Sequence, residues 1–148
     1  MEGHRLQTST PAGGWCLAAG LVCVPRQGAC RCRGMPRDPR KLEVFHLAHR
    51  LAVEVYRVTE ALPPAERFGL QSQLRRAAVS IPANLVEGCA RRTARDYERF
   101  IELALGSAVE LRYLLDLAQD LELLPAKALA PGKECSDHVV RALHQLQQ

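Results

Sequence analysis

The chain has 148 residues, a length typical of a single domain, with 47% hydrophobic and only 5% aromatic residues. Alanine and leucine are abundant and runs of β-branched residues are few, so the composition favours helices. The net charge of +4 is unevenly distributed: residues 1–41 hold seven Arg and Lys against two acids, whereas residues 42–148 hold thirteen against fourteen. The basic charge therefore belongs to the N-terminal tail, and it is weak evidence for a nucleic-acid-binding domain.

Residues 1–40 are rich in Gly, Pro, Arg and Cys and show no periodicity, so they are predicted to be a disordered basic tail. The apolar run from Trp15 to Val24 is too short to span a bilayer and makes a poor signal peptide, so no membrane role is expected. Met35 stands just before the first patterned segment, which suggests that translation starts there. Peptide mapping of the native N-terminus tests this hypothesis, and peptides from upstream of Met35 would reject it.

The cysteines and histidines do not predict a metal site or a cofactor. Four of the six cysteines lie in the tail, with a spacing unlike paired zinc knuckles, and a disulfide cluster there would need a secretory route. His46 and His49 are three residues apart, but no third ligand accompanies them, so surface histidines are expected. The tail cysteines are Cys16, Cys23, Cys30 and Cys32.

The first patterned segment predicts a helix from about Pro39 to Leu62, ended by Pro63 and Pro64. Leu51 and Val58 widen its apolar side. The residues on that side are Phe45, Ala48, Ala52, Val55, Thr59 and Leu62.

The central segment 68–92, FGLQSQLRRAAVSIPANLVEGCARR, predicts one long helix with a proline in its middle. Pro82 has no N–H and crowds the carbonyl of Ala78, so a kink is expected, with Ser80 bonding back one turn. Gly88 is well placed to end the helix. At 100° per residue, one face collects Leu70, Leu74, Ala77, Ala78, Ile81 and Leu85.

A narrow polar stripe runs beside this apolar face and has two interpretations. It is either a solvated or hydrogen-bonded seam, which is favoured, or a contact for a ligand or nucleic acid. Cys89 is likewise either a small buried hydrophobe or, near the arginines, a thiol with a lowered pKa, and packing is the better explanation. The stripe consists of Gln73, Arg76, Ser80, Asn84 and Glu87.

A third helix is predicted to begin at Thr93, which forms a capping box with Asp96, and to reach about Leu121. Gly106 and Ser107 in its middle permit close approach of a neighbouring helix. The segment from Leu124 to Gly132 predicts a loop, followed by a short fourth helix over about 133–147. Together these elements predict an all-α, up-and-down antiparallel four-helix bundle over residues 41–148.

The segment 68–92 resembles the four-helix-bundle family of the 23S ribosomal RNA intervening-sequence proteins, which also includes the accessory variability proteins of diversity-generating retroelements. The likeness extends to LEVFHLAHRLAVEVY in the first helix and RDYERFIELALGSAVELRYLL in the third, over about residues 41–121. Cys89 departs from the aromatic residue common in the family, and the segment after Leu121 is less well patterned. The matching positions are Arg75, Arg76, Ser80, Pro82, Asn84, Glu87, Gly88 and Arg91.

The resemblance implies a small cytoplasmic bacterial protein that assembles as a homopentamer, in a family most of whose members have no known activity. The retroelement members bind a reverse transcriptase and nucleic acid through basic surfaces, so RNA or such an enzyme is the partner that the resemblance suggests. Ser80, Pro82, Asn84, Glu87 and Gly88 are expected to be structural.

Two hypotheses for function follow. In the first, the oligomer binds RNA or an RNA-handling protein; in the second, it is purely structural or binds other proteins, and the same arginines hold intersubunit salt bridges. An enzyme is not expected, because the chain lacks the motifs of hydrolases, zinc proteases, P-loop proteins and di-iron bundles, and no small-molecule substrate is indicated. The arginines proposed to contact nucleic acid are Arg75, Arg76, Arg91, Arg92, Arg95 and Arg99.

Overall fold

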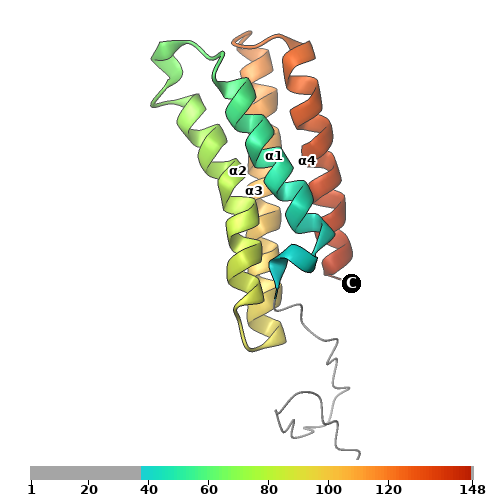
Figure 1. Cartoon of the computed structure of the whole chain (residues 1–148). Coiled ribbons are helices and arrows are strands. Elements are labelled where there is room, and N and C mark those ends of the chain that lie inside the picture. The colour runs from blue at the N-terminus through green and yellow to red at the C-terminus, as the bar shows by residue number, and fades with distance from the viewer. Residues whose placement is uncertain (1–37, 148) are drawn as a thin grey trace, which may run out of the picture. The chain divides into compact units, whose positions relative to one another are not determined.

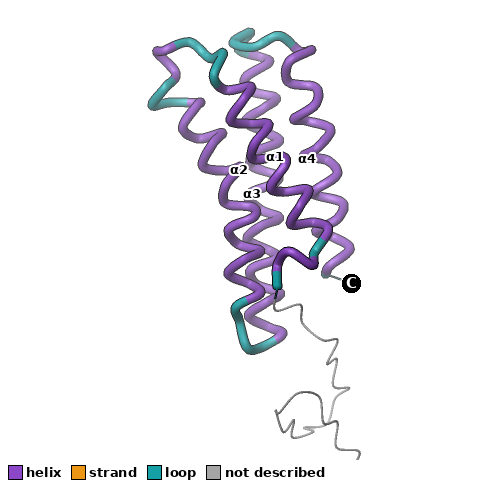
Figure 2. Tube along the Cα trace, viewed as in Figure 1, coloured by secondary structure: helices purple, strands orange, loops and turns teal. Residues whose placement is uncertain are grey.

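The computed structural model describes residues 38–147, which form four α-helices, two short 3-10 turns and no strand (Figures 1 and 2). The all-α prediction is confirmed for this part of the chain. The predicted tail up to residue 37, including Met35 and four cysteines, lies outside the described residues. The helices are α1 (Glu43–Thr59), α2 (Leu70–Cys89), α3 (Ala94–Asp120) and α4 (Ala126–Leu146).

The helices run up and down the bundle, and short connections at alternating ends join each one to the next (Figure 1). α1 packs against α2 and α4, and α3 packs against the same two helices. The centre is filled by aliphatic side chains with no exposed surface, as the spacing of apolar residues predicts. The largest of them are Leu51, Leu74, Ile81, Leu85, Ile101, Leu111, Leu115, Leu129 and Leu143.

The first helix is shorter than predicted, because Leu42 has an extended backbone that separates the 3-10 turn Pro39–Lys41 from α1. Asp38 caps this turn by accepting a hydrogen bond of 3.0 Å from the Arg40 N–H. At the other end α1 stops at Thr59, four residues before Pro63.

α2 continues through Pro82 as predicted, but it begins at Leu70, so Phe68 lies outside the helix. Of the polar side chains near the proline, Ser80 connects α2 to α3 and Asn84 bonds to Ser80 within α2. Ser80 Oγ lies 2.9 Å from Ser107 Oγ, and Asn84 Nδ2 donates to the Ser80 carbonyl at 2.8 Å. The prediction that Ser80 bonds back along its own helix is wrong, because α3 offers its hydroxyl a partner. This part of the polar stripe is a hydrogen-bonded seam.

Gly88 does not end α2, because the helix continues through Cys89. It lies buried against α3, where a Cβ atom would be 3.0 Å from Phe100 Cβ and 3.5 Å from Tyr97 Cδ2. Gly88 therefore lets the two helices approach closely. No described helix of the same chain approaches Gly106, which is exposed, and a Cβ there would meet no atom within 4 Å.

α3 begins as predicted, because the Thr93 hydroxyl accepts from the Asp96 N–H at 3.1 Å and donates to its carboxylate at 2.6 Å. Residues 94–120 then give 27 residues of unbroken helix.

The prediction of a loop from Leu124 to Gly132 and a short fourth helix is wrong. α4 begins at Ala126 and contains Pro131 as its sixth residue. Beyond the first turn of a helix, a proline removes the hydrogen bond to the carbonyl four residues back, here that of Lys127, and its ring crowds that carbonyl, at a cost of about 3 kcal/mol. Burial offsets that loss, since Leu129 has no exposed surface and Gly132 is also buried, with α3 close by at Leu115.

Candidate nucleic-acid interface

Arg75 is a structural residue that joins α2 to the end of α1. Its Nε donates to Thr59 Oγ1 at 2.9 Å, and its guanidinium lies 4.7 Å from the centre of the Tyr56 ring. The Thr59 hydroxyl is fully buried and in turn donates to the Tyr56 carbonyl at 3.1 Å. Gln71 Nε2 donates to the Thr59 carbonyl at 2.9 Å, so α2 supplies partners to the free carbonyls at the end of α1.

Replacing Arg75 with methionine is expected to lower the free energy of unfolding by roughly 1.5 kcal/mol, because a hydrogen bond from a charged donor is lost at a buried hydroxyl. Chemical denaturation of the variant measures this loss. Arg76→Met is the matched control, since the neighbouring Arg76 is exposed and bonds only Gln73 on its own helix. Equal stability of the two variants would contradict the structural role of Arg75.

The other arginines gather around the connection between α2 and α3, and we call Arg91, Arg92, Arg95 and Arg99 the turn arginines. All four are exposed. Arg91 lies 3.5 Å from the Glu87 carboxylate, and its guanidinium is 4.5 Å from the centre of the Phe100 ring. Within residues 38–147, the remaining three make no ion pair.

The structure thus divides the predicted arginines between two places. Arg76 and Arg91 are fifteen residues apart on and just after α2, which corresponds to roughly 22 Å along a helix. The start of α2 and the connection from α2 to α3 lie at opposite ends of the bundle (Figure 1). The predicted set is not one continuous patch.

A basic and aromatic surface that the sequence did not indicate lies near the start of α2. Phe68 is 88% exposed, and Tyr56 on α1 is 43% exposed. Arg67, Phe68, Tyr56 and Arg76 line one shallow groove, together with Gln71, Ser72, Arg75 and Val79. Phe68 breaks the apolar periodicity of α2, and this was the only available signal for it in the sequence.

The outer side of α3 carries a second set of apolar residues, in addition to those that face the core. Leu103, Val109 and Tyr113 are 47%, 54% and 63% exposed, and Gly106 lies among them. We call these residues the outer stripe of α3. A helix that is apolar on two sides is typical of one that packs against two neighbours.

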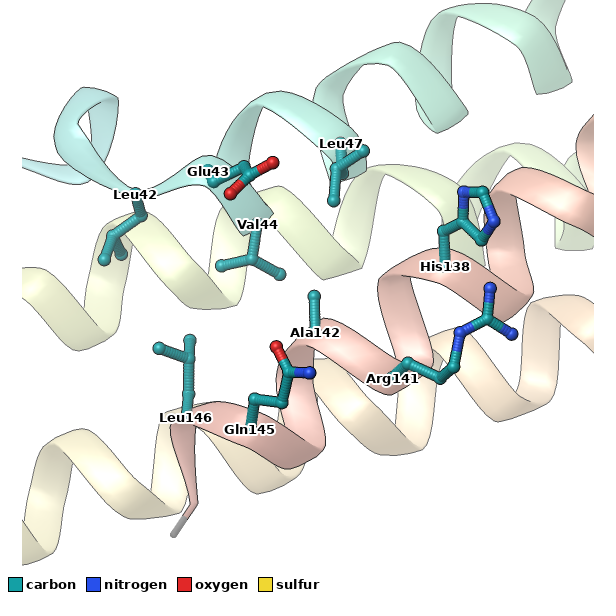
Figure 3. A pocket seen from close by; sticks show the side chains of 9 residues that line it. All are labelled: Leu42, Glu43, Val44, Leu47, His138, Arg141, Ala142, Gln145 and Leu146. Carbon is teal, nitrogen blue, oxygen red and sulfur yellow. The ribbon is translucent and has the colours of Figure 1, made fainter.

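Another open groove follows α1 and α4, where Leu42, Val44, Ala142 and Leu146 face one another beside His138 and Arg141 (Figure 3). None of the arginines predicted to bind nucleic acid lines it. In the described part of the chain, no three His, Cys, Asp or Glu residues are grouped as a metal site would require. None of the helices described here has the length and apolar character that crossing a membrane requires.

Cys89 is buried at the end of α2. Burial, with a smaller contribution from the negative charge of Asp38, raises the pKa of its thiol. The alternative of an activated thiol near the arginines is therefore wrong, and packing accounts for this residue.

Comparison with known proteins agrees with the fold. Residues 40–145 match the family model described as 23S rRNA-intervening sequence protein. A solved structure of a protein with unknown function from the S23 ribosomal protein family of Bacteroides thetaiotaomicron superposes with a TM-score of 0.67 at 22% identity, covering 71% of this chain and 98% of that one. No curated protein matches the chain. Because the family model covers most of the sequence, the chain belongs to the family of 23S rRNA-intervening sequence proteins.

Proposed function

We propose that this protein is a non-enzymatic, self-assembling helical bundle that binds RNA, or an RNA-handling partner such as a reverse transcriptase, through its turn arginines. The observation that carries the proposal is the exposure of Arg92, Arg95 and Arg99 without an ion pair among the described residues. An exposed guanidinium group that is not engaged by a carboxylate can bind two phosphate oxygens with two parallel hydrogen bonds.

Self-assembly would strengthen the binding of RNA to the turn arginines. The outer stripe of α3 continues from the turn arginines along the same helix, so a copy packed there would bring further arginines close to the first set. Several weak phosphate contacts on one particle bind a long RNA far more tightly than one copy does. A ring of five copies, as the family resemblance suggests, is the assembly that we propose.

A non-enzymatic role is favoured by the chemistry of the nucleophiles. The Ser80 hydroxyl is engaged by Ser107 and Asn84 rather than by a histidine base. Burial raises the pKa of the thiols of Cys89 and Cys135, which keeps both protonated and poorly nucleophilic at neutral pH.

Replacing Arg92, Arg95 and Arg99 together with glutamine is expected to weaken RNA binding about tenfold at moderate salt and to reduce the slope of log affinity against log salt by about 3. The loss of three phosphate contacts is the physical reason. Fluorescence anisotropy of a labelled RNA over a salt series measures both quantities.

The matched control replaces Arg50, Lys127 and Arg141 with glutamine. These three bases are also exposed and make no ion pair within residues 38–147, and the change in net charge is the same. The basic tail is present in both variants, so its contribution to RNA affinity is the same in both and does not affect the comparison. Equal weakening by the two triple variants would show that overall charge, not the turn arginines, attracts RNA.

The alternative is a purely structural oligomer or a protein-binding module, and the outer stripe of α3 is the observation that favours it. In that case Tyr113→Ser and Leu103→Ser lower the molar mass measured by light scattering, while RNA binding is absent in the parent protein. An RNA affinity of the intact protein that falls steeply with salt would instead support the first function.

A further inference from the structure

Phe68 is the most exposed large apolar side chain of the described residues, with 88% of its surface accessible. It stands between the 3-10 turn Pro64–Glu66 and the start of α2, outside the core. An exposed aromatic ring offers a face for stacking, whereas the half-buried Tyr97 and Phe100 pack near Gly88.

Two exposed arginines line the groove together with this ring. The Arg67 guanidinium lies 5.6 Å from the centre of the Phe68 ring, and Arg76 lines the same groove with its exposed side chain. No acidic residue lines the groove, whereas the grooves along α1 and α4 each include a glutamate. The site therefore complements a ligand that combines a flat apolar surface with negative charge.

We propose that this surface binds single-stranded RNA, with a base stacked on Phe68 and phosphates bound by Arg67 and Arg76. The inference rests on the proposed function, adds a second RNA contact at the opposite end of the bundle from the turn arginines, and names the form of RNA that this contact binds. Single strands expose the faces of their bases, whereas a duplex covers them, and bases stacked on aromatic side chains are the usual way in which proteins hold single strands.

The surroundings hold the site in place. The Arg75 guanidinium stacks on the Tyr56 ring and bonds Thr59, which fixes the wall of the groove on α1. Glu66 Oε2 accepts from the Leu70 N–H at 3.1 Å, which fixes the segment between the turn and α2. An acidic peptide would use the arginines but would gain little from an open ring face, so a nucleic acid fits the site better.

Fluorescence anisotropy with a labelled single-stranded RNA and with the same strand in a duplex tests the proposal on the full chain. Phe68→Leu keeps an apolar side chain but removes the ring, and it is expected to weaken single-strand binding about tenfold while leaving duplex binding unchanged. Phe68→Trp is expected to bind the single strand at least as well as the parent. Both variants are expected to keep the parent melting temperature, because Phe68 contributes little to the core.

Arg67→Gln tests the charged part of the site, and Arg141→Gln is its control, since both arginines are exposed and Arg141 lies on α4. Arg67→Gln is expected to weaken binding of the single strand more than Arg141→Gln does. Equal effects of the two variants would overturn the assignment of a phosphate to Arg67.

Three other results would overturn the proposal. Phe68→Leu binds the single strand as the parent does; Phe68→Leu changes the molar mass of the particle, which would make Phe68 a contact between copies; or Phe68→Leu weakens binding of an oligoglutamate peptide as much as binding of RNA, which would indicate an acidic protein partner. If Phe68→Leu has no effect but the triple variant of the turn arginines loses binding, only this inference fails. If the parent binds no RNA, the proposed function fails first.

Discussion

Replacing Leu129 with alanine is expected to lower the free energy of unfolding by about 2–5 kcal/mol, the range for removing a buried leucine side chain. Leu129 has no exposed surface and lies in the second turn of α4, within the segment that the sequence predicts to be a loop. The same substitution of a leucine in a surface loop would lower the free energy of unfolding much less. The experiment therefore asks directly whether α4 begins before Pro131.

Leu121→Ala is the matched control. Leu121 is 56% exposed at the end of α3, so the same substitution there is expected to change the free energy of unfolding by only about 0.5 kcal/mol. Urea denaturation followed by circular dichroism gives both values. Near-equal midpoints for the two variants would mean that residues 126–132 do not pack against the core.

Replacing Gly88 with valine is expected to cost about 2–3 kcal/mol, because the new Cβ would lie 3.0 Å from Phe100 Cβ and its two methyl groups would need further space. Phe100 Cβ is held by the backbone of α3, so the two helices must move apart to relieve the contact. Valine has a slightly better helix propensity than glycine, which offsets only a few tenths of a kcal/mol of this loss.

The same substitution at Gly106 is the control, since no atom lies within 4 Å of a Cβ there. Gly106→Val is expected to leave the free energy of unfolding unchanged or slightly higher at low protein concentration, where copies do not pack on the outer stripe of α3. Thermal melts of the two variants separate the steric effect at Gly88 from the conformational effect of losing a glycine. A Gly88→Val protein as stable as the parent would show that α2 and α3 are further apart than described.

Local patterns in the sequence were sufficient to predict most of the fold. The apolar face of α2, from Leu70 to Leu85, is buried as predicted, and the start of α3 at Thr93 follows from a capping box that needs only neighbouring residues. The errors occur where distant residues decide. Pro131 by itself predicts a loop, but packing of Leu129 in the core keeps this segment helical. Gly88 by itself predicts a helix end, but its contact with Phe100 of α3 shows that it serves close packing.

The candidate interface was predictable only in part, because charge in a sequence does not indicate what a side chain contacts. Arg75 and Arg76 are adjacent and chemically identical, yet Arg75 bonds Thr59 of α1 and Arg76 is exposed. Phe68 was counted as the first residue of a helix, although it lies before α2 and is open to solvent.

The sequence by itself determined that residues 38–147 are helical, how many helices they form, and which side of each faces the core, because the period of apolar residues is a local property. Only the tertiary structure decided which arginines hold helices together and which are open to a partner. It also decided that Phe68, Arg67 and Arg76 share one groove. Hydrogen-bond partners and exposure depend on residues that are distant in the chain, and folding alone brings them together.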